Sequence, residues 1–167
     1  LKGRWGATTI LSLAIGQGEL GFTPMQMANM VTAIANRGHY ITPHIAKEVN
    51  GTSIRELDSS IVRNETGVDA KYFDEVVEAM YLVVKQGTGT GAKIDSLEVC
   101  GKTGTVQNPH GDDHSTFIAF APKDNPKIAL SVYVENGYWG SRWAAPIAGL
   151  LIEEYLRDTI TRPAIEK

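Results

Sequence analysis

The segment VCGKTGTV, residues 99–106, is predicted to form the β-strand around which the chain folds. Its glycines leave positions without a side chain, where another backbone or a ligand can approach closely. Successive strand residues point to opposite faces, so Thr103 and Thr105 share one face while Lys102 and Gly104 share the other. If this strand lies at the edge of a sheet, its free N–H groups and the hydroxyls beside them can bind an extended ligand that carries a carboxylate.

Two more strands and a helix are predicted after this segment. Residues 116–121 and 127–135 are rich in apolar and β-branched side chains, and residues 122–126 between them form a turn. This pattern predicts an antiparallel hairpin beside the strand at residues 99–106. Residues 143–157 carry apolar side chains at helical spacing and are expected to pack across the sheet.

The N-terminal part is predicted to contain a strand followed by a helix. Residues 9–15 are apolar and partly β-branched, which is typical of a short buried strand. Thr23 can cap a helix that begins at Pro24, where the missing N–H is harmless, and Gln26 can complete a capping box. Gly38 is expected to end this helix.

The apolar face of this helix is expected to pack into the core. It consists of Met27, Met30, Val31, Ile34 and Ala35, which recur at helical spacing. Gln17 and Glu19 precede the helix. Their polar side chains can line a substrate groove, but the favoured interpretation places them in a turn or on the surface.

Residues 39–44 are predicted to form an extended connector, followed by a hairpin with Asn50 and Gly51 at its turn. The strands of the hairpin are expected over residues 45–49 and 53–57. His39 and His44 have a spacing that two metal ligands can adopt, but no Cys, Asp or Glu lies at a helpful interval nearby. A metal site is therefore not predicted here.

Asp69 can cap a second long helix with a wide apolar face. This face consists of Tyr72, Phe73, Val76, Val77, Met80, Val83 and Val84. Residues 86–91 follow with glycines at alternate positions. They invite comparison with a nucleotide-binding loop, but they follow a helix instead of a strand and lack the phosphate-binding lysine. We expect a flexible connection.

The composition is that of a globular protein with one domain and a substantial core. The chain has 167 residues, of which 43% are hydrophobic and 21% charged. Its formal charge of −3 gives no basic field for nucleic acid. The single cysteine, Cys100, is expected to be a buried, unreactive thiol. No membrane span or signal peptide is visible, and because the chain begins at Leu1, we expect it to be a piece of a longer protein.

The tripeptide Lys102-Thr103-Gly104 resembles the third motif of the penicillin-recognising serine transferases and hydrolases. By itself the tripeptide also fits an exposed strand with a polar face. From about residue 11 to about residue 156, however, the chain is similar to class B penicillin-binding proteins, most closely the elongation-type penicillin-binding protein 2. The similar segments are residues 15–19, 23–28, 34–38, 43–44, 114–122 and 144–146.

Two other motifs of that family are absent from this chain. In the family, a lysine three residues after the nucleophilic serine activates it, and a second serine stands two residues before an asparagine. None of the serines here has either neighbour. Ser60 comes closest, but Arg63 at the third following position stays protonated and cannot act as the base. The resemblance therefore implies that residues 1–167 are the C-terminal part of one transpeptidase domain, without the helical portion that bears the nucleophile.

The resemblance implies an α/β fold, with an incomplete antiparallel sheet packed with helices. It also implies a role for each matching residue. Lys102 would supply positive charge to the catalytic cleft, and Thr103 and Thr105 would offer hydroxyls to the substrate carboxylate. The backbone N–H of Thr105 would be one donor of the oxyanion hole, and Gly104 would keep the strand open to the substrate backbone.

The reaction implied by the resemblance is D,D-transpeptidation, the serine acyl transfer that cross-links peptidoglycan stem peptides and that β-lactams block. The motifs require no cofactor and no metal. The implied partners are stem peptides, β-lactams, the rest of the transpeptidase domain and cell-elongation membrane proteins. The implied location is the extracytoplasmic face of the membrane, with an anchor outside this chain. The alternatives are a D-Ala-D-Ala carboxypeptidase or β-lactamase of the same superfamily, and a non-catalytic module that binds cell-wall peptides.

Overall fold

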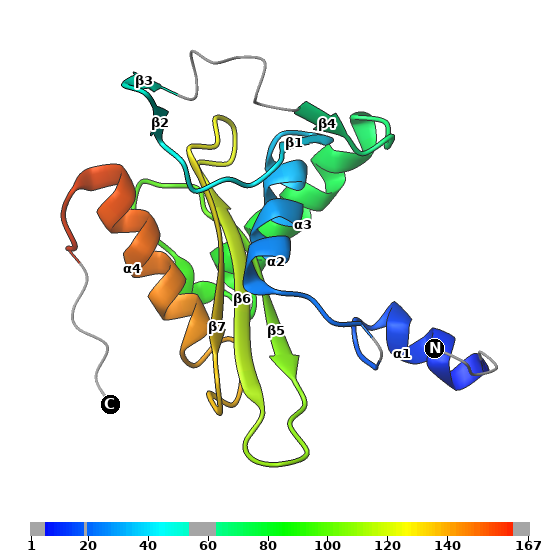
Figure 1. Ribbon diagram of the computed structural model, residues 1–167. Coiled ribbons are helices and arrows are strands. Elements are labelled where there is room, and N and C mark those ends of the chain that lie inside the picture. The colour runs from blue at the N-terminus through cyan, green and yellow to red at the C-terminus, as the bar shows by residue number, and fades with distance from the viewer. Residues whose placement is uncertain (1–5, 19, 54–62, 162–167) are drawn as a thin grey trace.

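The structure is a computed structural model that describes residues 6–18, 20–53 and 63–161 (Figure 1). The helices are α1 (Ala7–Ala14), α2 (Pro24–Ala35), α3 (Lys71–Gln86), the 3₁₀ helix η2 (Thr90–Ala92) and α4 (Ala144–Arg157). The strands are β1 (His39–Ile41), β2 (Glu48–Val49), β3 (Thr52–Ser53), β4 (Arg63–Glu65), β5 (Cys100–Val106), β6 (His114–Ala121) and β7 (Ile128–Val134).

The main sheet is antiparallel with the order β5-β6-β7, which confirms the predicted strand and hairpin. Helix α4 packs on one face and helices α2 and α3 cover the other (Figure 1). Strand β6 is central, and its side chains alternate between two cores. Phe117 and Ala119 pack toward α4, while Phe120 packs toward α2 and α3. The result is the predicted α/β architecture, with helices against an antiparallel sheet.

Helix α2 begins as predicted. The Thr23 N–H donates to Gln26 Oε1 over 2.8 Å, and the Gln26 N–H donates to Thr23 Oγ1 over 3.3 Å, so the capping box is complete. Val31 and Ala35 are buried in the core as expected. The prediction for Met30 is wrong, because 45% of its surface is exposed.

The prediction of a buried strand at residues 9–15 is also wrong. This segment forms helix α1, and none of its residues is buried. A strand needs a neighbouring strand to bond its backbone groups, and none pairs with this segment in the described parts of the chain. Leu11, Leu13 and Ala14 favour a helix, in which the backbone satisfies itself.

The hairpin signal at Asn50 and Gly51 is confirmed. Strands β2 and β3 pair on either side of it, and both turn residues have positive φ, as a two-residue hairpin turn requires. The predicted strands were longer, and residues 54–57 lie outside the described residues. The extended connector at residues 39–44 was not predicted to pair, but β1 within it forms a two-stranded sheet with β4.

Helix α3 begins near Asp69, as predicted, since Asp69 Oδ1 accepts a hydrogen bond from the Lys71 N–H over 3.2 Å. The glycine-rich segment after α3 is a closely packed turn, which corrects the prediction of a flexible connection. A Cβ added at Gly89 would lie 3.2 Å from the Phe117 ring, and one at Gly91 would lie 3.0 Å from the Pro146 ring. These glycines allow the turn to approach β6 and α4.

Candidate functional site

Strand β5 carries the residues that the sequence singled out. It pairs with β6 in the register Lys102 opposite Ile118, Gly104 opposite Thr116 and Thr105 opposite Ser115. Within the described residues its other edge has no paired strand. Strand β5 is thus an edge strand, which is the condition for receiving an extended ligand beside it.

Lys102 is exposed to solvent beside this edge. Its ammonium Nζ donates to the backbone carbonyl of Thr103 over 2.8 Å. This contact folds the side chain back along its own strand. The ammonium therefore stays at the surface of β5, where it can turn toward an anionic ligand with little rearrangement.

Thr103 is half-buried, and its hydroxyl lies 2.8 Å from the hydroxyl of Thr88. Thr88 belongs to the glycine-rich turn after α3, so this pair joins two segments that are distant in the sequence. Sequence reasoning gave Thr88 no role. The glycines at alternate positions around it predict a flexible connection, and nothing local indicates a contact with β5.

Gly104 is required by its surroundings. A Cβ at this position would collide with the Thr116 hydroxyl on the neighbouring strand. The backbone at Gly140 approaches Gly104 so closely that a Cβ on Gly140 would come within 2.9 Å of the Gly104 nitrogen. Strand β5 is therefore held between β6 and the turn before α4 at the point where its side chain is missing.

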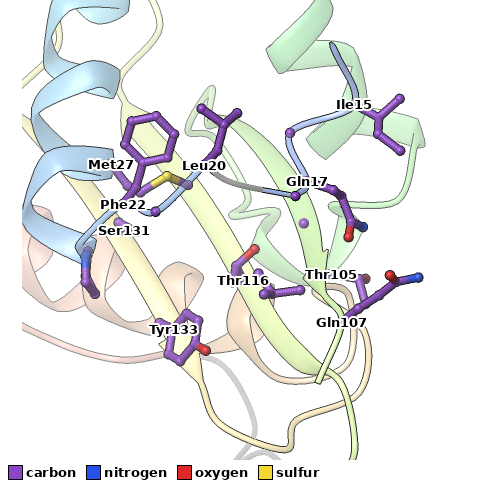
Figure 2. Close-up of a pocket in the computed structure, with 16 residues that line it drawn as sticks. Ile15, Gln17, Leu20, Phe22, Met27, Thr105, Gln107, Thr116, Ser131 and Tyr133 are labelled. Carbon is purple, nitrogen blue, oxygen red and sulfur yellow. The ribbon is translucent and has the colours of Figure 1, made fainter. Parts of the chain in front are cut away.

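A pocket of about 530 Å³ opens beside the C-terminal half of β5 (Figure 2). Gly104 and Thr105 line it from the strand, Gln107 lines it from just after the strand, and Tyr133 lines it from β7. Its opposite wall is the segment between α1 and α2, which includes Gln17. The pocket combines apolar walls with several amide and hydroxyl groups.

Two of the four predicted site residues line the pocket. Gly104 and Thr105 line the pocket, whereas Lys102 and Thr103 do not, although they belong to the same strand. Gln17 lies in the turn between α1 and α2, as the favoured interpretation expects, and it also lines the pocket. Glu19 lies outside the described residues.

Cys100 is fully buried at the start of β5, as predicted. Its burial is the main cause that raises the pKa of the thiol to about 12. Such a thiol carries almost no thiolate at neutral pH, so it is a poor nucleophile. Cys100 therefore packs in the core and takes no part in chemistry at the pocket.

The described residues contain neither a metal site nor a membrane-spanning helix. No group of three or more His, Cys, Asp or Glu side chains in those parts of the chain is arranged to hold a metal ion. None of the helices there has the length and apolar character that crossing a membrane requires.

Comparison with known proteins gives consistent matches over almost the whole chain. Residues 2–153 match the model of the penicillin binding protein transpeptidase domain family. The peptidoglycan D,D-transpeptidase MrdA of Haemophilus influenzae is 32% identical over 99% of this chain and 28% of its own length. MrdA of Acinetobacter baumannii is 31% identical over 93% of this chain and 25% of its own length. The chain thus spans roughly a quarter of these curated relatives.

Solved structures agree with the sequence matches. PBP2 of Pseudomonas aeruginosa, in complex with WCK 5153, is 36% identical and superposes with a TM-score of 0.81, covering 94% of this chain and 34% of that one. Penicillin-binding protein A of M. tuberculosis, solved as an imipenem acyl-enzyme complex, is 28% identical with a TM-score of 0.79. That match covers 91% of this chain and 35% of the other.

Proposed function

Because this chain belongs to the class B penicillin-binding protein transpeptidases, we propose that it forms one wall of the active site of a peptidoglycan D,D-transpeptidase. One observation carries the proposal: Gly104 and Thr105 of the edge strand β5 line a pocket. An acyl donor peptide can lie along the unpaired edge of β5 as an added strand. The serine nucleophile belongs to a segment outside this chain.

Lys102 and Thr103 bind the terminal carboxylate of the donor peptide. The Lys102 ammonium is exposed and adjacent to the strand edge, so it attracts the carboxylate without a large desolvation cost. Thr103 offers a hydroxyl, which now pairs with the Thr88 hydroxyl. An exchange of that partner for a carboxylate gives a stronger, charge-assisted hydrogen bond.

Thr105 acts at the reacting carbonyl. Its backbone N–H is one of two donors that stabilise the oxyanion, and its hydroxyl also faces the carboxylate. Removing one such donor typically lowers the rate by about 100- to 1000-fold. Gly104 keeps the strand free of a side chain where the substrate backbone approaches. The collision of an added Cβ with Thr116 supports a strict requirement for glycine there.

The reaction is an acyl transfer in two steps. The serine oxygen attacks the carbonyl of the penultimate D-alanine, the peptide bond breaks, and D-alanine leaves with the proton on its amine. The amine of a neighbouring stem peptide then attacks the acyl-serine ester and releases the serine. A β-lactam imitates the donor and leaves a slowly hydrolysed ester. The enzyme would act on the extracytoplasmic face of the membrane, with cell-elongation membrane proteins as partners and without a cofactor.

Covalent labelling with a fluorescent penicillin, followed by intact mass, tests this proposal. The labelling is done on this polypeptide and on one extended upstream through the serine motifs. We expect one label on the longer form and none on the shorter. Labelling of the 167-residue chain itself would mean that one of its own serines is acylated, and would contradict the assignment of the nucleophile to an upstream segment.

A further inference from the structure

Gln17 stands at the pocket in a fixed backbone geometry. The glycines on either side of it, Gly16 and Gly18, have φ values of 77° and 79°, which side-chain-bearing residues rarely adopt. The Gln17 N–H donates to the Ser12 carbonyl over 2.9 Å. These two features turn the chain sharply between α1 and α2 and determine where the Gln17 side chain points.

The carboxamide of Gln17 is directed toward the end of β5. In Figure 2 it points at Thr105 and Gln107, on the side of the pocket opposite Tyr133 of β7. Within the described residues, neither the Gln17 carboxamide nor the Gln107 carboxamide has a hydrogen-bond partner. A carboxamide has two N–H donors and one carbonyl acceptor. The pocket therefore holds polar groups whose hydrogen-bonding capacity is available to a ligand.

An extended peptide bound to β5 needs groups of this kind. Its inner edge bonds to β5, but its outer edge presents N–H and C=O groups that have lost part of their water and gained no strand partner. One side chain that both donates and accepts can satisfy a neighbouring N–H and C=O pair. Gln17 is the carboxamide that approaches β5 from the opposite wall of the pocket.

We infer that Gln17 is a substrate-binding residue, which holds the outer edge of the donor peptide while β5 holds its inner edge. This inference rests on the proposed transpeptidase function and adds a contact that its motifs do not include. It predicts selectivity between two kinds of acyl donor. An extended stem peptide engages Gln17, whereas a penicillin nucleus is too short along the strand to depend on it.

The test compares both donors on the intact transpeptidase that contains this chain. The variants are Gln17→Ala, which removes the carboxamide, and Gln17→Glu, which keeps its size but loses the N–H donors. D-alanine release from a synthetic stem pentapeptide gives kcat/KM, and labelled penicillin gives the acylation rate. For both variants we expect kcat/KM for the pentapeptide to fall, by about three- to tenfold for each hydrogen bond that is lost, so that Gln17→Glu loses the donated bond and Gln17→Ala loses both bonds. Penicillin acylation should stay within about twofold of wild type.

Gln86→Ala is the matched control, because Gln86 is an exposed glutamine at the end of α3 that does not line the pocket. It should leave both rates unchanged. If Gln17→Ala and Gln17→Glu lower kcat/KM for the pentapeptide and the penicillin acylation rate by the same factor, and also lower the melting temperature, Gln17 has only a structural role. The inference is then wrong. Unchanged pentapeptide kinetics in both variants would also overturn it. If the wild-type protein is not acylated by penicillin at all, the proposed function itself fails.

Discussion

Helices α1 and α4 are both rich in apolar residues, but only α4 buries them. Ala144, Ala148 and Ile152 of α4 are fully buried against the sheet. No residue of α1 is buried, and Ile10 and Leu11 expose 60% and 67% of their surface. Figure 1 shows α4 along the sheet and α1 standing away from it. Burial therefore depends on the surface opposite a helix, and apolar composition alone does not determine it.

This contrast orders the expected effects of substitution. Side chains between α4 and the sheet are surrounded by other side chains, so their removal leaves a cavity. Side chains of α1 already contact water in the described structure, so their removal leaves no cavity. The expected loss of stability on substitution therefore decreases from the buried sheet to α1.

Phe117→Ala should have the largest effect on stability. The Phe117 ring is fully buried on the α4 side of β6, and it also fills the space above Gly101 and beside Gly89. We expect the free energy of unfolding to fall by about 3–5 kcal/mol, as for other buried aromatic residues replaced by alanine. Urea denaturation followed by circular dichroism measures this change. A loss of less than about 1 kcal/mol in the free energy of unfolding would mean that helix α4 and the main sheet do not pack around Phe117 as described.

Cys100 should make stability depend on alkaline pH. Burial raises the thiol pKa from its ordinary value of 9.0 to about 12. Between these values the unfolded chain has lost the thiol proton and the folded chain still holds it, so stability falls as pH rises. The slope from this group is at most about 1.4 kcal/mol per pH unit.

The Cys100→Ala variant isolates this contribution, because lysine and tyrosine side chains titrate in the same range in both proteins. The free energy of unfolding is measured for both between pH 8 and about pH 11. We expect the difference between them to shift steadily in favour of the variant above about pH 9. A difference that stays constant with pH would show that the thiol is solvated in the folded protein.

Ser115→Ala should have an intermediate effect. The buried Ser115 hydroxyl donates to the Trp139 carbonyl over 2.8 Å and accepts from the Ala144 N–H over 3.1 Å. It thus joins β6 to the turn before α4 and to the first residue of that helix. Its removal leaves the buried Ala144 N–H and the partly buried Trp139 carbonyl without this partner and should cost about 1–3 kcal/mol. Thermal unfolding of Ser115→Ala beside Ser115→Thr, which keeps the hydroxyl, would separate the lost hydrogen bonds from altered packing.

Thr23→Ala should have a smaller effect, because it disrupts a cap at the surface. The variant loses the hydroxyl that accepts the Gln26 N–H, so helix α2 loses one half of its capping box. We expect stability to fall by about 1 kcal/mol. The Thr23→Ser variant keeps the hydroxyl and should stay close to wild type. Equal losses in both variants would mean that the methyl group, and not the cap, stabilises this position.

The features that sequence reasoning predicted correctly depend on neighbouring residues. The capping box requires only Thr23 and Gln26, and the hairpin requires only Asn50 and Gly51. Strand β5 was recognised from its own residues. Each of these signals is complete within a few positions, so no knowledge of the tertiary structure was needed.

The features that were missed depend on contacts between distant segments. The Thr88–Thr103 pair spans 15 positions and the Ser115–Ala144 bond spans 29, and no local pattern indicates either. The apolar run of α1 fits a buried strand as well as a helix, and what distinguishes the two is that no strand of the described residues pairs with it. The part of the candidate site on β5 was therefore predictable, whereas the wall that contains Gln17 was not.

Leu11→Ala should have the smallest effect and provides the sharpest test of the contrast between α1 and α4. Since the Leu11 side chain is mostly exposed and alanine favours helices at least as well, the free energy of unfolding of this chain should change by less than about 0.5 kcal/mol. The corresponding change in α4, Ile152→Ala, removes a fully buried side chain and should cost about 2–5 kcal/mol. Both are measured by the same urea titration. Similar losses at the two positions would mean that α1 packs against the protein in solution, and that its apolar residues are buried as the sequence alone predicted.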